Sequence, residues 1–531
     1  MLFTEILNSI RVSQWASLQR LHGRQLTELR GRPTRLQLAP LLSLAFCLML
    51  QSPVQSQALT LKGDRETTIR QIAPGITLQQ EITTGASHLV VTILRVDMKR
   101  KDVRVESGQA NDEISLNGKF EGRETVAEIA KRRGAIAAVN ADFFPYTGDP
   151  LGLEIRMGEF LSETMNYRAC LGISHDKIRI AVLTTLGFWT TKLGQGLLHG
   201  INRLPASGEI TLLTPSFRAE IPAPRSLTLI PVADLQLPVR LSQSFEGLLG
   251  EKLLIAKGSA LPKIIKSGGF LAIGEDVQTP LRNPALRDAI ISMTFHLIDS
   301  GEPLEDGKRQ TLSDFIGRKH SIIWNDVKEA IGGGPWLVKK GRLFVDGEAE
   351  KFDLLNFIEA RHPRTAVGVT SKQELLLVAV DGRVPWSQGA SLPEMAEIML
   401  RLNAVDAMNL DGGGSTSLLL KDQYLNAPSD GKARPVADCL LIFSGKAHSP
   451  EAKKETEKTV VSEEQTVRVG ETLSLVSGLD SAQSKSALWG TDEGFGFVDQ
   501  SGVFTSSKQG RGIVFALIDK RKFVFPVTVT P

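Results

Sequence analysis

Cysteine is scarce in this sequence. The 531 residues include three cysteines, Cys47, Cys170 and Cys439, and none lies at the short spacing of a metal-binding cysteine cluster. Cys170 and Cys439 each sit in an apolar, strand-like run. We therefore expect two buried free thiols, with a disulfide between them as the alternative.

Excess charge of one sign is also missing. The chain has 62 Lys and Arg against 59 Asp and Glu, a formal net charge of +3. This balance gives no reason to expect nucleic acid or an anionic membrane surface as a partner, so any recognition of an anion must be local. The hydrophobic content of 42% is that of an ordinary globular protein.

Long apolar runs are absent beyond the N-terminal region. Six arginines between Arg11 and Arg35 precede the apolar run Leu36–Leu50, and Ser56-Gln57-Ala58 resembles a cleavage site. Fifteen residues are short for a membrane span, which needs about 20. We expect residues 1–58 to be a signal peptide and the protein to be exported, to the periplasm, the cell surface or the medium; an uncleaved anchor is the alternative.

The rest of the chain alternates short β-branched runs with turn residues. This pattern predicts an α+β fold, with a mixed β-sheet domain over 59–445 that has few helices. A Lys- and Glu-rich stretch at 446–465 indicates a charged linker. Short strands around a single Trp489 then predict a small all-β sandwich of the immunoglobulin type at 466–531, which resembles bacterial Ig-like domains and would serve as a spacer or surface-binding module.

Specific elements are predicted with their bounds. The expected strands are Leu89–Val96, Ala135–Asn140, Leu227–Val232, Ile290–Leu297, Ala366–Val369 and Leu375–Val380, and the expected helices are Glu124–Arg133, Leu312–Ile316 and Leu392–Leu402. The long stretch from Gly187 to Leu286 carries no strong motif. We expect it to be strand-rich filling within the domain.

The most informative segment is Asn409-Leu410-Asp411-Gly412-Gly413-Gly414-Ser415-Thr416. Ser391 and Glu394 form a capping box that begins a helix, Asn403 ends it, and Ala404–Leu410 follows as a strand. The three glycines then allow a sharp turn whose N–H groups can face an anion. No Lys follows them, so a nucleotide P-loop is not expected; a glycine-rich hairpin without a ligand is the plainer reading.

The same construction occurs earlier in the chain. Residues 128–142 align without gaps on residues 397–411 and share Glu, Ile, Arg, Ala, Ala, Asn and Asp in order. Gly134 stands where Asn403 ends the second helix, and both residue types tolerate a left-handed C-cap. Our hypothesis is that a duplicated helix–strand unit brings Asn140-x-Asp142 and Asn409-x-Asp411 to one site. Chance convergence of two amphipathic units is the alternative.

Three further corners carry glycine or charge. Arg364 and Thr365 open an apolar strand after His362, Asp381-Gly382-Arg383 closes the next strand, and Gly332–Pro335 leads into Trp336, whose ring could stack on a sugar. An Arg at such a place can hold a phosphate by two parallel hydrogen bonds. Each corner taken alone is also explained as a turn.

Taken in order, these five corners resemble the phosphodiester glycosidase family, over roughly residues 85 to 445. The motifs that carry the resemblance are 139–144, 333–338, 363–368, 381–383 and 409–416. The first departs from the family pattern, which often has Gly after the Asn where this chain has Ala141.

The resemblance implies hydrolysis of a sugar-1-phosphodiester between the anomeric carbon and the phosphate oxygen, which releases free sugar and a phosphate monoester. Its expected catalytic carboxyls are Asp411, then Asp142 or Glu154. The expected substrate and phosphate ligands are Asn140, Arg364, Thr365, Asp381, Arg383, Asn409, Gly412, Gly413, Gly414 and Ser415, with Asn202 and Arg203 as extra candidates. The substrate partner would be a sugar-1-phosphodiester or a cell-envelope glycan.

Two other classes of function stay open. A metal-dependent phosphodiesterase could use Asp142, Asp381 and Asp411, but the sequence has no His–Asp cluster at ligand spacing, so no cofactor is expected and a divalent cation is only an alternative. A carbohydrate-binding protein of the cell surface would use the same pocket without turnover.

Overall fold

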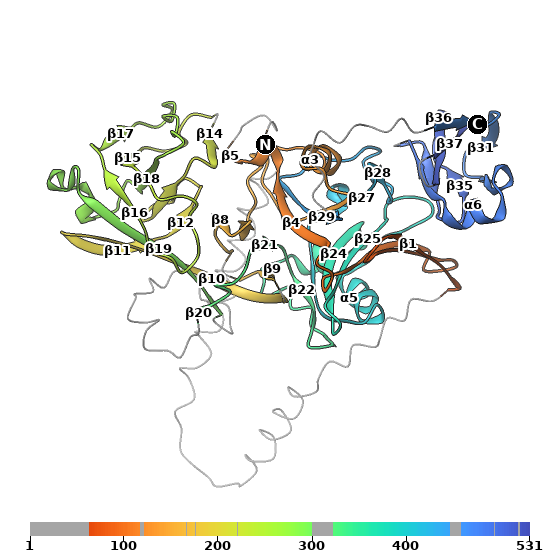
Figure 1. Cartoon of the computed structure of the whole chain (residues 1–531), viewed down its shortest axis with the longest axis horizontal. Helices are drawn as coiled ribbons and strands as arrows, with labels where there is room; N and C mark the ends of the chain where they lie inside the picture. The colour runs from red at the N-terminus through yellow and green to blue at the C-terminus, as the bar shows by residue number, and fades with distance from the viewer. Residues whose placement is uncertain are drawn as a thin grey trace, which may run out of the picture. The chain divides into compact units, whose positions relative to one another are not determined.

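The structure, a computed structural model, describes residues 63–531 apart from 117–121, 166, 176, 220, 300–321, 446–457, 493 and 519–520. The expected signal peptide, the predicted helix at 312–316 and the first part of the predicted linker lie outside these residues. Residues 60–531 form one compact unit. Its elements are predominantly strands, as expected for a β-rich fold with few helices (Figure 1).

Two antiparallel sheets frame the centre of the molecule. The first has eight strands, in the order β1 (Arg65–Ala73), β2 (Ile76–Thr83), β3 (Leu89–Asp97), β25 (Glu374–Val380), β24 (Arg364–Thr370), β26 (Ala404–Asn409), β22 (Trp336–Lys339) and β23 (Arg342–Leu343). The second has five, in the order β28 (Gln423–Tyr424), β27 (Leu418–Leu420), β6 (Ala137–Asn140), β29 (Asp438–Ser444) and β4 (Val103–Gln109). The predicted strands at 89–96, 135–140, 366–369 and 375–380 are confirmed within a residue or two at their ends.

Apolar side chains from both sheets meet in one core. Leu94, Val367 and Leu377 of the first sheet belong to the same buried cluster as Val139 and Leu440 of the second. The strands read as continuous apolar runs because they are covered on both faces. Burial on this scale fixes the register of β6 and β26, and with it the place where each strand ends.

The two helix–strand units predicted from the sequence are both present. Helix α3 (Val126–Arg133) precedes β6, and helix α5 (Leu392–Arg401) precedes β26. Each helix begins with a capping box, made by Thr125 with Glu128 and by Ser391 with Glu394. Gly134 after α3 and Asn403 after α5 have φ values of 73° and 68°, the left-handed geometry that ends a helix.

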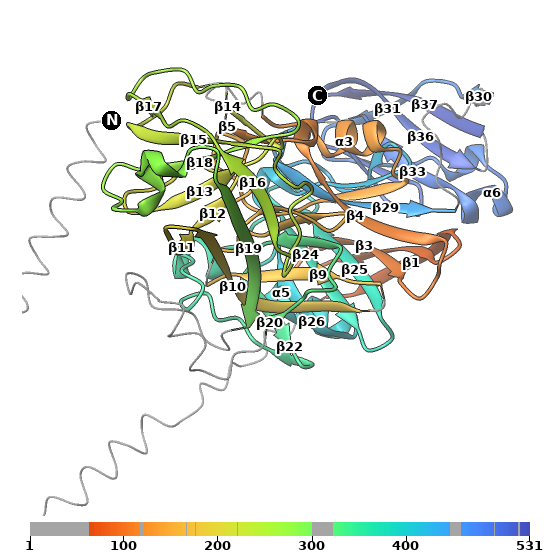
Figure 2. The same ribbon diagram turned by 60° about the vertical axis from the view of Figure 1, so that its left-hand side comes forward.

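The motif-poor stretch after Gly187 forms a lobe of its own around two long strands. Strand β10 (Ile178–Thr191) pairs with β9 (Ala169–Ile173) through its first half and with β19 (Ile290–Asp299) through its second half (Figure 2). The other strands of this sheet are β7 (Glu154–Arg156), β8 (Glu159–Ser162), β11 (Gly194–Leu198), β12 (Gly200–Ile201), β13 (Ile210–Leu213), β15 (Leu227–Ala233), β16 (Phe245–Leu249), β17 (Leu253–Ile255), β18 (Gly269–Gly274), β20 (Ile322–Ile323) and β21 (Glu329–Gly332). Its separate apolar core shows that the stretch is more than filling.

The last part of the chain holds two small sheets. One contains β30 (Lys458–Val461), β31 (Gln465–Arg468), β33 (Leu488–Thr491), β36 (Gly510–Ile518) and β37 (Arg521–Thr530), and the other β32 (Thr472–Ser474), β34 (Gly496–Val498) and β35 (Val503–Ser506). Trp489 is buried in their common core, as expected. The predicted linker is too long at its C-terminal end, because residues 458–461 pair with β37 as strand β30.

The thiol prediction is confirmed for Cys170 and Cys439, which are free and buried in strands β9 and β29. Among the described residues, none of the helices combines the length and apolar character that crossing a bilayer requires.

Candidate active site

Main-chain hydrogen bonds join four of the five corners at one place. The Asp411 N–H donates to the carbonyl of Ala141 (2.9 Å), and the Leu410 N–H donates to that of Thr365 (2.9 Å). The Gly334 N–H donates to the carbonyl of Asn409 (2.8 Å) and that of Gly413 to Pro363 (2.8 Å). The two Asn-x-Asp corners therefore lie side by side, at the ends of β6 and β26.

The Asn140 side chain ties this junction together. It is fully buried, and its Nδ2 donates to the carbonyl of Asp411 (2.7 Å). Its Oδ1 accepts from the Thr365 hydroxyl (2.9 Å) and the Ser417 N–H (3.0 Å). Both amide atoms of Asn140 are thus engaged within the protein, which makes Asn140 and Thr365 residues that position the corner.

Asn409, the matching residue of the second unit, is buried as well. Its Nδ2 donates to the carbonyls of Gly334 (2.9 Å) and Leu410 (2.7 Å). In the glycine turn that follows, some of the main-chain N–H groups are also hydrogen-bonded within the protein. The Gly412 N–H donates to Asp411 Oδ1 (2.9 Å) and that of Gly413 to Pro363, so two of the three N–H groups expected to face an anion are engaged.

Asp411 stands at the half-buried opening of the corner. Burial raises its pKa to about 6, while the Ser415 hydroxyl, the Gly412 N–H and the charge of Arg434 act in the opposite direction. A carboxyl with this pKa is mostly ionised near neutral pH. It can therefore act as nucleophile or base.

Asp142 is more deeply enclosed. Its carboxylate accepts the N–H groups of Phe143 and Gly152, both at 2.7 Å, and it fits between two glycines, since a Cβ on Gly332 or Gly152 would lie within 2.8 Å of its Oδ2. Burial, with a smaller contribution from the charge of Asp411, raises the pKa of Asp142 to about 7. Asp142 thus keeps its proton to higher pH than Asp411.

Two more carboxyls stand behind Asp142. Asp438 Oδ1 accepts the Asp142 N–H (2.9 Å), and the fully buried Glu154 accepts from Gln109. Burial raises the pKa of Glu154 to about 8 and that of Asp438 well above its ordinary value, and the charge of Glu154 acts on the pKa of Asp438 in the same direction. Both carboxyls therefore keep their protons near neutral pH. The sequence analysis missed Asp438, although a carboxylate at the start of an apolar strand was the available signal.

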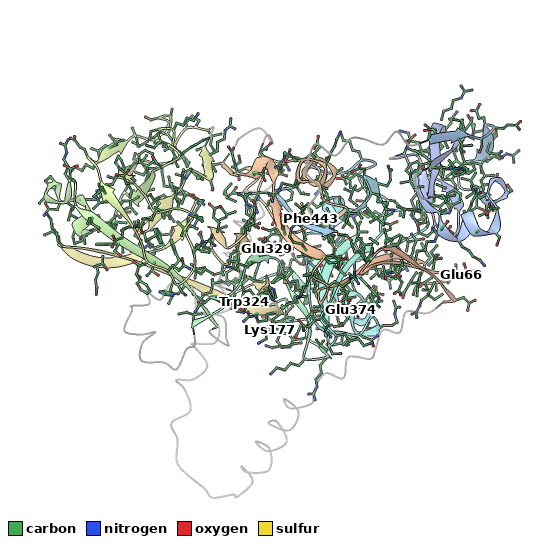
Figure 3. All side chains as sticks on the ribbon, viewed as in Figure 1. Glu66, Lys177, Trp324, Glu329, Glu374 and Phe443 are labelled. Atoms are coloured by element: carbon green, nitrogen blue, oxygen red, sulfur yellow. The ribbon has the colours of Figure 1, made fainter. Side chains whose placement is uncertain are left out.

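A fourth buried carboxyl, Glu329, lies at the start of β21 and is labelled in Figure 3. It accepts the N–H groups of Ser107 and Met157, both at 2.9 Å. These bonds tie β4 and the turn after β7 to β21, so Glu329 supports the strand that leads into Gly332.

Arg364 does not occupy the open part of the corner. It is 1% exposed; its Nε donates to the carbonyl of Ala390 (2.9 Å), and its Nη2 to those of Phe357 (2.5 Å) and Ala360 (2.8 Å). Burial lowers its pKa to about 10. Arg364 therefore holds these loops together through their carbonyls, in contrast to the phosphate-binding role expected from the sequence.

Two other arginines cover the glycine turn. Arg383 is exposed, and its guanidinium lies 3.4 Å from the position that a Cβ on Gly413 would take. Its Nη2 bonds His362 Nδ1 (2.9 Å). Arg434, which the sequence analysis missed, pairs with Asp430 (2.7 Å), lies against Gly414 and approaches the Ser415 hydroxyl (3.5 Å).

A third cation adjoins Asp142. Arg168 lies over the rings of Phe143 (5.3 Å) and Phe352 (4.3 Å), and the charge of Asp142 raises its pKa although burial lowers it overall. Arg168, Asp142 and the glycines Gly332 and Gly333 line one recess that is too small to hold a water molecule. No motif flagged Arg168 in the sequence, because a lone Arg between two strands has no pattern.

The remaining predicted residues lie away from the recess or use their side chains for contacts within the protein. Asp381 is buried and accepts from the Ala427 N–H (3.0 Å) and Trp386 Nε1 (3.4 Å). Trp336 is 7% exposed and packs on Phe344, so the expectation that it stacks on a sugar is wrong. Arg203 pairs with Glu163 and Glu209, and Asn202 bonds Leu161 and Thr214.

Across the described part of the chain, there is no group of three His, Cys, Asp or Glu side chains placed to hold a metal ion.

Similarity to known proteins agrees with these positions in part. Residues 295–443 match the family described as phosphodiester glycosidase, a range that contains four of the five corners but not Asn140-x-Asp142. The N-acetylglucosamine-1-phosphodiester alpha-N-acetylglucosaminidase of Bos taurus is 34% identical over 114 residues, which is 20% of this chain and 21% of that protein. The SPbeta prophage-derived uncharacterized protein YomE of Bacillus subtilis is 31% identical over 144 residues, 27% of this chain and 21% of that protein.

The fold is also found in a solved structure. A hypothetical protein from Synechocystis superimposes with a TM-score of 0.57 at 22% identity, covering 71% of this chain and 64% of that one. The chain spans about a fifth of the length of the relatives it matches in sequence. The comparisons thus give a shared fold and a phosphodiester glycosidase match confined to residues 295–443.

Proposed function

We propose that this protein is an exported hydrolase that cleaves a sugar-1-phosphodiester between the anomeric carbon and the phosphate oxygen, releasing free sugar and a phosphate monoester. One observation carries the proposal. Asp411 and Asp142 meet at one corner, with pKa values of about 6 and about 7, beside arginines that can hold a phosphate. A pair of carboxyls with separated pKa values is the usual equipment of a glycosidase.

The two carboxyls take different roles in this reaction. Asp411, mostly ionised, serves the anomeric carbon as nucleophile or as base for water, because positive charge develops there in the transition state. Asp142, which retains its proton to higher pH, exchanges a proton with the attacking water or the sugar. Glu154 lies behind Asp142 with Asp438, so its role is to keep Asp142 in place.

The phosphate needs charge stabilisation more than a proton. A phosphate monoester is a stable leaving anion, so the main demand is a set of fixed positive groups where charge builds up. Arg383 and Arg434 border the glycine turn, whereas Arg168 lines a recess without room for a phosphate and Arg364 is committed to three carbonyls. We assign the phosphate to Arg383 and Arg434.

A screen of sugar-1-phosphodiesters, with mass detection of free sugar and phosphate monoester, tests the activity. Asp411→Asn should lower kcat about a thousandfold and leave substrate binding nearly unchanged, because the amide keeps the shape but not the charge. The matched control is Asp422→Asn at an exposed turn position.

The same assays separate the rival functions. A carbohydrate-binding protein would bind the substrates and release no product from either variant. Turnover that disappears with a chelator and returns with a divalent cation would instead identify a metal-dependent phosphodiesterase.

A further inference from the structure

The lobe built around β10 and β19 contains a cavity of its own. Its volume is about 390 Å³, which lies in the range of small-molecule sites. Its apolar walls come from strands β13, β15 and β18 and from the segment 261–264. Among the described residues, none lines both this cavity and the recess beside Asp142, so the cavity is separate from the candidate active site.

The sheet under the cavity is apolar on both faces. Strand β13 pairs antiparallel with β18, with Leu212 opposite Leu271 and Leu213 opposite Phe270. Because side chains alternate along a strand, the first pair joins the main core of the lobe and the second pair joins a separate cluster on the opposite face. An antiparallel sheet commonly leaves its second face to water, but an apolar face needs a cover.

The cover of this second face is small. Strand β14 (Phe217–Ala219) pairs with β5 (Ile114–Leu116) in a sheet of two strands that lies against it (Figure 2). Leu261 and Ile264 pack on the same cluster and are only partly buried. Protein interiors are otherwise close-packed. The space left between the cover and the sheet therefore suits an apolar ligand.

The cavity lining also carries charge. Glu113, Arg218 and Lys263 belong to it, and Lys263 is exposed to solvent. Arg218 Nη1 lies 3.4 Å from Glu113 Oε2, so these two charges offset each other. Two positive groups against one negative group leave one net positive charge, that of Lys263. An anionic group at the end of an apolar ligand would complement it.

We propose that this cavity binds a fatty acid, with its alkyl chain against Leu213, Leu229 and Phe270 and its carboxylate beside Lys263. The apolar walls match the chain, and the single net positive charge matches a head group with one negative charge. This ligand is unrelated to the sugar phosphodiester of the proposed function. The lobe that the sequence predicts to be filling would thus have a binding function of its own.

Calorimetric titration of the protein with hexanoate, octanoate and decanoate tests the apolar part of the site. We expect Kd to fall about fourfold for each added methylene group, because each one that is buried contributes about 0.8 kcal/mol. Ala219→Phe places a ring in the cavity and should weaken the binding of decanoate at least tenfold. Ala256→Phe, at an exposed position of the same lobe outside the cavity, should bind decanoate like the wild type.

Decanol, which has no charge, tests the head group. Lys263→Glu should weaken the binding of decanoate about fivefold, since an exposed charge pair contributes modestly, and should change the binding of decanol less than twofold. Lys252→Glu, an exposed charge reversal of the same lobe outside the cavity, is the matched control.

Three results would overturn the proposal: no binding of decanoate to the wild type, a Kd independent of chain length, or binding that Ala219→Phe leaves unchanged. The first two use the wild type alone, so they decide the question even if a variant does not fold. None of these measurements depends on turnover. A failure of the proposed function is therefore distinguishable from a failure of the fatty-acid site.

Discussion

At the residue scale, the carboxyl groups of the site differ in how far they are removed from water. Asp411 is half-buried, Asp142 is 2% exposed, and Glu154 and Asp438 are fully buried. Their pKa values rise along the same series, from about 6 at Asp411 to about 7 at Asp142 and about 8 at Glu154. Burial is the largest cause in each case, because a charged carboxylate loses hydration when it is enclosed.

This burial predicts how stability depends on pH. Folded Glu154 holds its proton up to about pH 8, whereas the unfolded chain releases it above its ordinary pKa of 4.5. The folded state therefore binds more protons between these values, and the free energy of unfolding falls as pH rises through this window. Glu154→Gln cannot titrate, so its stability relative to the wild type should improve between pH 5 and pH 8, on the order of 4 kcal/mol.

Urea unfolding of both proteins at the two pH values measures this difference. Glu66→Gln, on the exposed face of β1 and labelled in Figure 3, is the control and should follow the wild type at both pH values. If the free energy of unfolding changes equally in Glu154→Gln and in the wild type between the two pH values, Glu154 is ionised in the folded protein.

At the scale of elements, two helix–strand units deliver Asp142 and Asp411 to one corner. The sequence predicted the beginning of α5 from Ser391 and Glu394 and the ends of both helices from Gly134 and Asn403, since capping is a local effect. The sequence could not predict which side chains would be buried or hydrogen-bonded within the protein where the two units meet. Arg364 and Trp336 have the residue types of ligands, and only tertiary packing places them inside.

The loop between β21 and β22 gives an element-scale prediction. A Cβ on Gly332 would lie 2.3 Å from Asp142 Oδ2 and 2.9 Å from the Cα of Gly152. Gly332→Ala should therefore push Asp142 out of place and lower kcat at least tenfold, with a loss of about 1–3 kcal/mol in the free energy of unfolding. Activity assays and urea unfolding measure both effects.

Gly250→Ala provides the comparison for this variant. Its new Cβ would meet the Pro231 side chain at 3.2 Å and lies in the other lobe, so activity should be retained. Full activity in Gly332→Ala would mean that Asp142 is free to move, or that it has no part in the reaction.

At the scale of the whole molecule, the chain is organised around the two central sheets. Alternation and turn residues in the sequence predicted many strands and their bounds, because each strand's pattern is local. The pairing of β10 with β19, and of β30 with β37, depends on segments far apart in the chain. No local pattern encodes such contacts. The sequence therefore predicts only filling for the lobe after Gly187, and a linker where β30 lies.

A long-range contact gives the prediction at this scale. Arg70→Ala removes the bonds that hold Gln500 and Ser484 against β1. Because these groups lose their partner, we expect the free energy of unfolding to fall by about 1–3 kcal/mol, as measured by urea unfolding. Arg65→Ala, exposed on the same strand, should leave the free energy of unfolding unchanged, and an equal loss in both variants would contradict a specific role of Arg70.

The hydrogen bonds of the Asn140 side-chain amide determine when the site can form as the chain folds. Its three hydrogen bonds close chain separations of 271, 225 and 277 residues. Contacts of this length are slow to form, because the entropy of closing a long loop must be lost before the contact is gained. The corner therefore does not exist in a growing chain that has not yet reached Ser417, and the site stays inactive until β26 and β27 join the sheets.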